Sequence, residues 1–492
     1  MKIFSRTACN KDTKPLLLAV FFAAVVTAIY VAFVVPTLDD PFLMAYAWRE
    51  AQSALGAQAI YNNVGWYFYP ALCPPWQLAF EFPIYQAMTA WLAKLFSCDL
   101  IVSGRLISSL MTFISGLGFA MIVNVLSKNK VAAILAFCGF LINPYYLSWA
   151  SAFLIESTAL AFSIWGLYFS IQKKHVFAML FLAAAMAIKA TTAAPVLLVC
   201  AIFIALDFYK SRAFKFAIIG VLASVVAPLA IGVAWTNTAD SIKSSSGYAR
   251  TLSNKEPVMK EWAYGTWEQK TNPATWQKIL TWSLVHNGGL PFVACLAVAF
   301  VLLPGNPLWR EAAAALIGWL TPLIVFTNLY YVHAYYGLAN NAFLLLFIAI
   351  VFVGAFQLGQ WRKSAALLAS VFMLSVYLTQ SFTATPPAAT TNSEYITRVG
   401  NFIKQNTPPE SVVIVTGVEW NPLLSFVAER KTMMLPDWER IRQDEVTSAV
   451  RALPQENVFF LNLAPGRIGD QLAQTAIREA GANVSVLKPG RL

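Results

Sequence analysis

The chain has 492 residues, of which 58% are hydrophobic and only 12% charged, and its mean hydropathy is +0.60. Soluble domains carry about 25% charged residues, so this composition excludes a soluble enzyme and predicts a polytopic α-helical membrane protein. The net charge of +11 lies entirely in residues 1–382, because residues 383–492 hold eleven basic and eleven acidic side chains. Basic loops beside membrane spans explain such an excess, and no nucleic-acid partner is expected.

The first apolar stretch, residues 16–36, is long enough to cross a hydrocarbon core, which needs about 20 residues. Four cations precede it, as in a signal peptide: Lys2, Arg6, Lys11 and Lys14. The stretch exceeds the apolar core of a signal, about 7–15 residues, and no small-x-small cleavage site follows it. We therefore expect a retained helix whose N-terminus lies in the cytoplasm.

The apolar pattern predicts about eleven transmembrane helices. Besides the first, they lie near residues 103–125, 131–148, 153–171, 175–189, 191–208, 216–235, 286–303, 312–328, 336–358 and 364–382. Alternate loops carry the basic segments "SKNK", "QKKH", "YKSRAFK", "LWRE" and "QWRKS". By the positive-inside rule these loops face the cytoplasm, so the long loops 37–102 and 236–285 face outward, together with the C-terminus. A bacterial inner membrane is the expected location.

The outer loop 37–102 has two helical patterns, "FLMAYAWREAQSAL" and "PIYQAMTAWLAKLF", which favour amphipathic helices at the membrane interface. The aromatic segment between them suits either a rigid loop lining a cavity or a belt of interfacial anchors. Cys73 and Cys98 share this loop, and a disulfide between them is a hypothesis. The outer loop 236–285 is polar and rich in Trp, so a lid is one option for it.

Residues 383–393, "TATPPAATTNS", have the composition of a linker. Residues 394–492 then alternate short β-rich runs with helical patterns, which predicts a small α/β domain with a mainly parallel sheet on the outer face. The runs are "SVVIVTG", "KTMMLP", "NVFFLNL" and "NVSVLK". The segment "GRIGD" lacks the G-x-G-x-x-G spacing, so no dinucleotide cofactor is assigned.

Ionisable residues near membrane spans are unfavourable unless paired or solvated, so each is a candidate functional residue. In the predicted topology most of them gather at the outer ends of their segments: Asp39, Asp40, Glu81, Arg105, Glu156, Lys189 and His333. Asp207 alone lies at a cytoplasmic end, beside basic loop residues. The pattern predicts an outward-facing charged cavity.

A cavity that combines carboxylates with cations suits group transfer from a lipid phosphate carrier. Cations hold the phosphate, and a carboxylate takes the proton of an attacking hydroxyl. In the pair Asp39–Asp40, each charge raises the proton affinity of its neighbour, which favours a base. The same residues would equally serve a proton-coupled transporter.

Five stretches, spread over residues 15–380, resemble the GT-C membrane glycosyltransferases, in particular the group of protein O-mannosyltransferases and lipid A aminoarabinose transferases. "LDDPFLMAYAWREAQSALG" is similar to that group's acidic first-loop motif and the helix after it. The others are "EFPIYQAMTAWLAKLFSCDLIVSGRLISSL", "NPYYLSWASAFLIESTALAFSIWGLYF", "AAAMAIKATTAAP" and "YYVHAYYGLANN". They follow in the order that the group shows.

The resemblance implies an inverting transferase that moves a sugar from a polyprenyl-phosphate donor to a lipid, glycan or protein acceptor. Asp39, with Asp40, would form the catalytic base region. The donor and its phosphate would contact Arg49, Glu81, Arg105, Glu156, Lys189, His333, Tyr335 and Tyr336. The cation expected beside Glu81 is Phe82 here, so phosphate binding must rely on Arg49, Arg105 or Lys189.

Other interpretations compete with these assignments. Asp39–Asp40 would also serve as a helix N-cap pair, Arg105 as a snorkelling interfacial residue, and Glu156 as a cap or as the ion-pair partner of Lys189. His286 is interpreted as an interface residue. The three histidines lack metal-ligand spacing, so no protein metal site is expected, although a divalent cation shared with the donor phosphate is left open. For the whole protein the rivals are a transporter or flippase of a lipid-linked substrate and a scaffold for the α/β domain.

Overall fold

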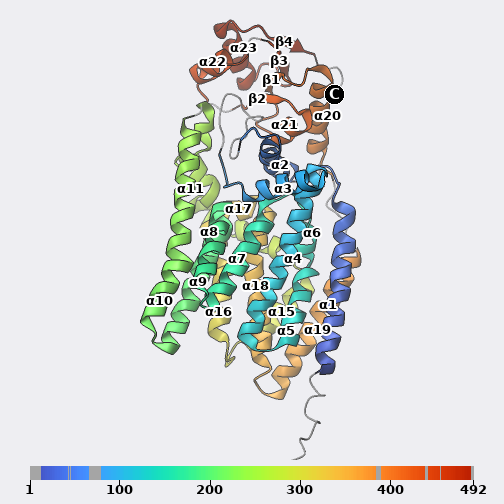
Figure 1. The fold of residues 1–492 in the computed structure, drawn as a ribbon, viewed down its shortest axis with the longest axis vertical. Helices are drawn as coiled ribbons and strands as arrows, with labels where there is room; N and C mark the ends of the chain where they lie inside the picture. The colour runs from blue at the N-terminus through green and yellow to red at the C-terminus, as the bar shows by residue number, and fades with distance from the viewer. Residues whose placement is uncertain are drawn as a thin grey trace, which may run out of the picture.

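The computed structural model describes residues 13–42, 44, 46–65, 79–245, 247–383, 389–437, 441–454 and 456–488. A bundle of apolar helices carries an α/β domain at one end (Figure 1). We call this end of the bundle the domain side and the opposite end the far end. The N-terminal helix α1 (Thr13–Val34) begins at the far end and runs toward the domain side.

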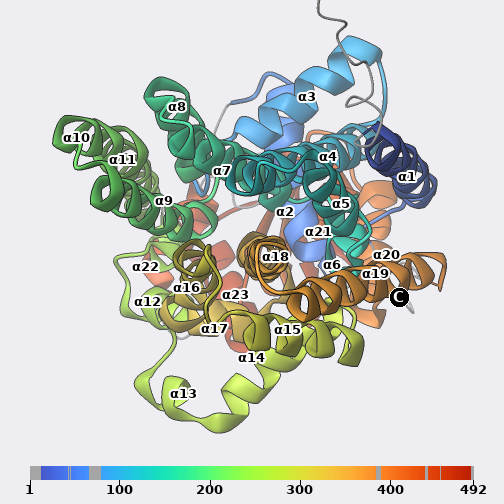
Figure 2. The ribbon, with the colours of Figure 1, turned by 90° about the horizontal axis from the view of Figure 1, so that it is seen from below.

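The bundle is built from long or strongly apolar helices. After α1 they are α4 (Leu100–Ser127), α5 (Lys130–Leu141), α7 (Ile155–Ile171), α8 (His175–Ile188), α9 (Ala190–Ser211), α10 (Phe214–Val221), the π-helical turn η2 (Leu222–Val226), α11 (Ala227–Ser244), α15 (Leu290–Leu302), α16 (Trp309–Val325), α18 (Gly337–Ala355) and α19 (Gln360–Thr383). Helix α18 lies at the centre of the bundle (Figure 2) and is almost entirely buried, whereas α1 and α19 are mostly exposed along their apolar lengths. The exposed apolar surface of the outer helices fits a lipid environment, and the protein is an integral membrane protein.

Six described helices are long and apolar enough to span a membrane, or seven if the pair α14 (Pro273–His286) and α15, bent by 99°, counts as one span. Three shorter apolar helices, α5, α7 and α8, add to them. A helix occupies every segment predicted as a span, but the expected count of eleven spans is not confirmed. The difference arises because several predicted spans are helices of only 12–17 residues, below the length of about 20 that a perpendicular span needs.

Short elements at the domain side surround the ends of the long helices. They are η1 (Val35–Thr37), α2 (Ala47–Tyr61), α3 (Ile84–Phe96), α6 (Pro144–Trp149), η3 (Gly247–Leu252), α12 (Pro257–Tyr264), α13 (Trp267–Thr271), α14, α17 (Thr327–Val332) and η4 (Ala334–Tyr336). A buried amide network fixes the bend between α14 and α15: Asn287 bonds to Asn143 at 2.9 Å and to Asn341 at 2.7 Å. Since buried amides must find partners, this network ties α6 and α18 to the bend.

The C-terminal α/β domain contains a four-stranded parallel sheet in the order β2-β1-β3-β4. Its elements are α20 (Thr391–Asn406), β1 (Val412–Thr416), α21 (Pro422–Ala428), β2 (Lys431–Leu435), α22 (Gln443–Arg451), β3 (Val458–Asn462), α23 (Ile468–Ala480) and β4 (Ser485–Leu487). The strands lie in the four predicted runs, and the sheet is parallel as expected. Helix α20 begins inside the expected linker 383–393, because Thr390 caps it through a bond from Ser393 N.

The α/β domain packs directly on the first loop of the domain side. Phe426 of α21 contacts Phe42 with ring centroids 5.2 Å apart, and Trp420 contacts Trp48 at 4.7 Å. Helix α2 is consequently buried along most of its length instead of lying on the membrane interface. Helix α3 does keep exposed apolar side chains, including Trp91 and Leu95, as an interfacial helix requires.

Candidate functional site

The Asp39–Asp40 segment leaves α1 at the domain side and is anchored on both sides. Before it, the Thr37 hydroxyl donates to Ser151 Oγ at 2.7 Å. After it, the Phe42 ring lies 5.5 Å from the Arg105 guanidinium, which donates to the Ser151 carbonyl oxygen at 3.0 Å. Ser151 therefore connects both anchors, and the loop between them has a fixed start and end.

Within that loop Asp39 is exposed and Asp40 is half-buried. Among the described residues neither carboxylate has a hydrogen bond or an ion pair. Helix α2 begins only at Ala47, with Tyr46 as its N-cap residue and no capping side chain. The interpretation of Asp39–Asp40 as a helix N-cap pair is therefore wrong, and both carboxylates are available to a ligand.

Arg105 lies in α4 and is fully buried, with a side-chain exposure of 1%. Its Nη1 is 3.5 Å from Glu50 Oε1, which also accepts a bond from the Phe153 backbone N–H at 3.0 Å. Burial at this depth contradicts the interpretation of Arg105 as a snorkelling residue. The sequence analysis missed Glu50; its place on α2 beside Arg49 was the only available signal.

Arg49 and Glu81 form a second ion pair, between α2 and the segment that leads into α3. Arg49 Nη1 also donates to Gln52 Oε1 at 2.6 Å. Burial by itself raises the pKa of Glu81, but attraction to Arg49 and Lys189 outweighs it and holds that pKa below its usual range. For Arg49, burial by itself lowers the pKa, but attraction to Glu81 and Glu156 outweighs burial and raises that pKa above its usual range. Arg49 and Glu81 therefore both stay ionised. Arg49 thus supplies, from another helix, the cation that Phe82 does not provide.

Glu156 and Lys189 form the third ion pair, which is buried on both sides. Lys189 sits at the break between α8 and α9, where its backbone is extended. Its ammonium lies 4.5 Å from the ring centroid of Tyr336 and 5.7 Å from that of Tyr335. The interpretation of Glu156 as the partner of Lys189 is confirmed, and two aromatic faces complete the surroundings of the cation.

His333 and two tyrosines follow α17 as a stacked row. The centroids of His333 and Tyr335 are 5.1 Å apart, and those of Tyr335 and Tyr336 are 4.8 Å apart. Burial, with repulsion from Lys189 and Arg49, lowers the pKa of His333 to about 4, so its imidazole is neutral near pH 7. Tyr46 packs against Tyr335 at 5.5 Å and joins the row to the start of α2.

Seven of the ten predicted site residues thus come together in what we call the buried cluster: Arg49, Glu81, Glu156, Lys189, His333, Tyr335 and Tyr336. Its two cations and two carboxylates cancel in charge. Arg105 belongs to the neighbouring pair with Glu50, and Asp39 and Asp40 lie on the loop anchored at Ser151. Within the described ranges, no group of three His, Cys, Asp or Glu side chains is placed to hold a metal ion.

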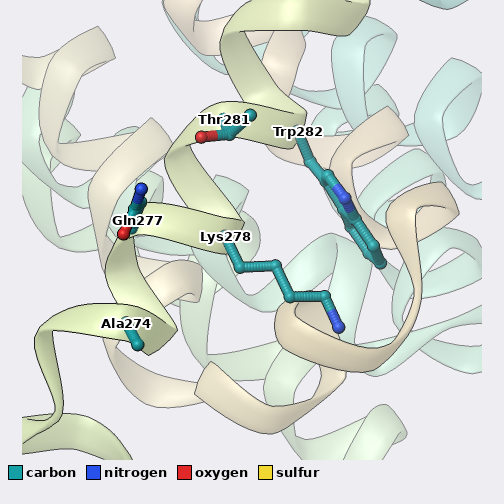
Figure 3. Close-up of a pocket in the computed structure, with 5 residues that line it drawn as sticks. All are labelled: Ala274, Gln277, Lys278, Thr281 and Trp282. Carbon is teal, nitrogen blue, oxygen red and sulfur yellow. The ribbon is translucent and has the colours of Figure 1, made fainter.

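A groove on α14 contains Lys278, a cation that the sequence analysis did not identify as a candidate (Figure 3). It has a volume of about 320 Å³ and is lined by Ala274, Gln277, Lys278, Thr281 and Trp282. The Lys278 ammonium lies 3.9 Å from the ring centroid of Tyr331 and 4.8 Å from that of Trp282. Tyr331 belongs to α17, which ends at His333, so the groove borders the helix that leads into the stacked row.

The remaining candidates lie apart from the cluster. His286 ends α14 and contacts Tyr145 at 5.7 Å. Asp207 is half-exposed at the far end and pairs with Lys173, but it lies in the last turns of α9 and not in a loop as predicted. Cys98 is a free thiol 3.1 Å from Ser103 Oγ, and its suggested partner Cys73 lies outside the described residues.

The arrangement of helices in this chain is similar to that of several solved membrane proteins. The chain is similar to ArnT from Cupriavidus metallidurans bound to undecaprenyl phosphate, with a TM-score of 0.55 and 15% identity over 90% of this chain and 89% of that one. It is also similar to the archaeal oligosaccharyltransferase AglB from Archaeoglobus fulgidus in complex with an inhibitory peptide and a dolichol-phosphate, with a TM-score of 0.52 and 12% identity over 95% and 69% of the two chains. The chain has the GT-C fold. This confirms the fold that the five stretches implied, although no protein-family model and no curated protein matches the sequence.

The similarity to these two structures concerns the fold around the candidate site. The similarity covers 90% of this chain in one comparison and 95% in the other. At identities this low the likeness establishes the arrangement of the helices and leaves the role of each side chain to its own geometry.

Proposed function

We propose that the protein transfers a sugar from a polyprenyl-phosphate donor to a hydroxyl of an envelope lipid, glycan or protein. The observation that carries this proposal is that two unpaired carboxylates, Asp39 and Asp40, lie at the same end of the bundle as a buried cluster containing two cations. Group transfer needs a base on one side of the reacting carbon and a binding site for the leaving group on the other. The GT-C fold holds both at one end of the bundle.

The donor class follows from the fold and from the charges of the cluster. The two solved relatives contain undecaprenyl phosphate and dolichol-phosphate. In this chain Arg49 and Lys189 are the cations that would hold such a phosphate, with the neutral His333 and the hydroxyls of Tyr335 and Tyr336 as further hydrogen-bonding groups. Arg49, Lys189 and Tyr335 are buried from water, which strengthens their interaction with a phosphate.

The charge balance of the buried cluster predicts that one more cation helps to bind the donor phosphate. Arg49 and Lys189 are already neutralised by Glu81 and Glu156, so a phosphate adds uncompensated negative charge to the cluster. Lys278, which has no ion pair among the described residues, lies in the groove beside α17. We therefore include Lys278 as a further cation for the donor phosphate.

In the proposed reaction Asp39 accepts the proton of the acceptor hydroxyl as its oxygen attacks the anomeric carbon. The bond from that carbon to the phosphate oxygen breaks with inversion, and both electrons leave with the phosphate. The leaving phosphate is a dianion held by cations, so no general acid is required. Asp40, the neighbouring carboxylate, binds the acceptor.

The proposed orientation of the protein is supported by its basic loops, which gather at the far end. Contacts tie these loops together there: Lys173 pairs with Asp207, Lys210 with Glu311, and Arg362 donates to the Pro304 carbonyl oxygen. By the positive-inside rule the far end faces the cytoplasm. The site and the α/β domain would then face the periplasm of a bacterial inner membrane.

The test compares envelope glycans, by mass spectrometry, from cells that make wild-type protein, Asp39→Asn or Asp40→Asn. Loss of a general base reduces rates by about 10²–10⁴-fold, so Asp39→Asn should abolish the added sugar at unchanged protein abundance, and Asp40→Asn should reduce it less. Glu410→Gln removes an exposed carboxylate of the α/β domain and serves as the matched control. Full transfer by Asp39→Asn would contradict the mechanism.

The same preparation distinguishes an enzyme from a flippase. Purified wild-type protein in vesicles should form a glycosidic bond when donor and acceptor are on the same side as the α/β domain. Movement of a lipid-linked substrate across the bilayer without any bond formation would favour the flippase instead.

A further inference from the structure

A pocket at the far end of the bundle lies outside the candidate site altogether. It has a volume of about 180 Å³ and is enclosed by the ends of α7, α8, α9, α10 and α16. Its polar lining consists of Ser170, Lys173, His175, Asp207, Lys210 and Glu311. We call it the far-end pocket.

Polar atoms in this pocket lack partners inside the protein. Both ring nitrogens of His175 are buried from solvent without a hydrogen bond inside the protein. Buried polar groups of a native protein are almost always hydrogen-bonded. Two such atoms of one side chain beside a cavity indicate a ligand with hydrogen-bonding oxygens.

The charges around the pocket favour an anion. Lys173 pairs with Asp207 and Lys210 with Glu311, each at 2.9 Å, and both lysines remain about half exposed. The three loops that surround the pocket carry six cations, Lys173, Lys174, Lys210, Arg212, Lys215 and Arg310, against the two carboxylates. Basic pockets between transmembrane helices bind anionic lipid headgroups in this way.

The apolar side chains of α10 beside the pocket indicate that the anion belongs to a lipid. Exposed apolar side chains of α10 and the turn after it, among them Phe216, Ile218 and Leu222, continue from the pocket toward lipid. A ligand with a phosphate headgroup and acyl chains fits both surfaces at once. We propose that the far-end pocket binds the phosphate of an anionic lipid headgroup from the adjoining leaflet, with His175, Ser170 and the two lysines as donors.

This proposal does not depend on glycosyl transfer, and binding measurements test it directly. The full-length protein is purified in detergent, and native mass spectrometry and thermal unfolding are recorded with phosphatidylglycerol, phosphatidylcholine or inorganic phosphate. Phosphatidylglycerol should form a stable adduct and raise the unfolding temperature, while phosphatidylcholine should do neither. An equal effect of phosphatidylcholine or of inorganic phosphate at the same concentration overturns the assignment to an anionic lipid.

Two variants locate the binding. Lys173→Gln/Lys210→Gln should weaken phosphatidylglycerol binding by about 25-fold, because each lysine contributes about a factor of five near an anionic lipid. Ala217→Leu changes no charge and fills the pocket, so it should also abolish the adduct and covers the case in which the double variant does not fold. Arg362→Gln/Lys363→Gln removes the same charge at the same end, outside the pocket lining, and should bind normally. Wild-type affinity of Ala217→Leu, or equal loss in the Arg362/Lys363 variant, overturns the proposal.

Discussion

The buried cluster and the far-end loops contain the same kinds of ion pair in very different surroundings. Glu156 and Lys189 have side-chain exposures of 1% and 5%, whereas Asp207 and Lys173 have 45% and 48%. Burying an ion pair carries a desolvation penalty that its attraction often fails to offset, while an exposed pair contributes almost nothing. A membrane bundle has no structural need for a buried pair, so the presence of one at the domain side favours a functional role. The exposed pair adds little to stability, so any role of Lys173 lies in binding and not in holding the fold together.

The largest expected effect comes from breaking the buried pair. Lys189→Met leaves the Glu156 carboxylate buried without a partner, which costs about 3–5 kcal/mol. We expect a much lower unfolding temperature in detergent and no transferase activity.

A double variant separates stability from function. Lys189→Met/Glu156→Leu replaces both charges by apolar groups and should recover most of the stability, because such exchanges are often neutral. It should still be inactive, since the cation for the phosphate is missing. Wild-type transfer by the double variant would show that Lys189 does not hold the donor.

A smaller effect is expected at the contact between the α/β domain and the cluster. Trp420 touches Trp48 and also stacks on Phe80 at 5.9 Å, and these two residues directly precede Arg49 and Glu81. Removing the indole with Trp420→Ala should let this ion pair shift and lower kcat by about tenfold with little change in KM, since small displacements at a site reduce rates strongly. Trp420→Phe should restore most of the activity. A loss of stability without any change in kcat would reduce Trp420 to a packing residue.

A pH experiment tests whether the imidazole of His333 is buried in its neutral form. Its pKa is about 4 in the folded protein, against an ordinary value near 6.5. Between these values the unfolded chain binds a proton that the folded protein does not, so stability falls as the pH falls from about 6.5 toward 4. His333→Gln should therefore lose less unfolding temperature between pH 7.5 and pH 5.0 than wild type. An equal or larger loss would contradict the burial of a neutral imidazole.

The smallest effect is expected at the exposed pair of the far end. Lys173→Gln, measured in detergent without anionic lipid, should change the free energy of unfolding by less than about 1 kcal/mol. High salt should reduce the difference further. A destabilisation as large as that of Lys189→Met would remove the contrast between the two regions.

Local patterns predicted a large part of the fold. The four short β-rich runs form the four strands, and each long apolar stretch forms a helix. Both could be predicted because hydrophobic periodicity is a local property of the chain. The span count was less accessible, since a 12-residue apolar helix such as α5 and a 28-residue one such as α4 look equally apolar in a short window. Helix α2 was predicted at the membrane interface, and its packing against α3, α4 and α21 explains its burial.

The sequence by itself determined the class of the protein, the residues that carry charge at the domain side and the resemblance to GT-C enzymes, because all three depend on composition and on local order. Tertiary structure alone decided the pairing: Arg49 with Glu81, Glu50 with Arg105, and Lys189 between Glu156 and two tyrosine rings. It also showed that Asp39 and Asp40 cap no helix. The physical reason is that burial and distance set the energy of a charge, and both depend on contacts between separate segments, from Arg49 and Glu81, 32 positions apart, to Lys189 and the tyrosines of η4 much further along the chain.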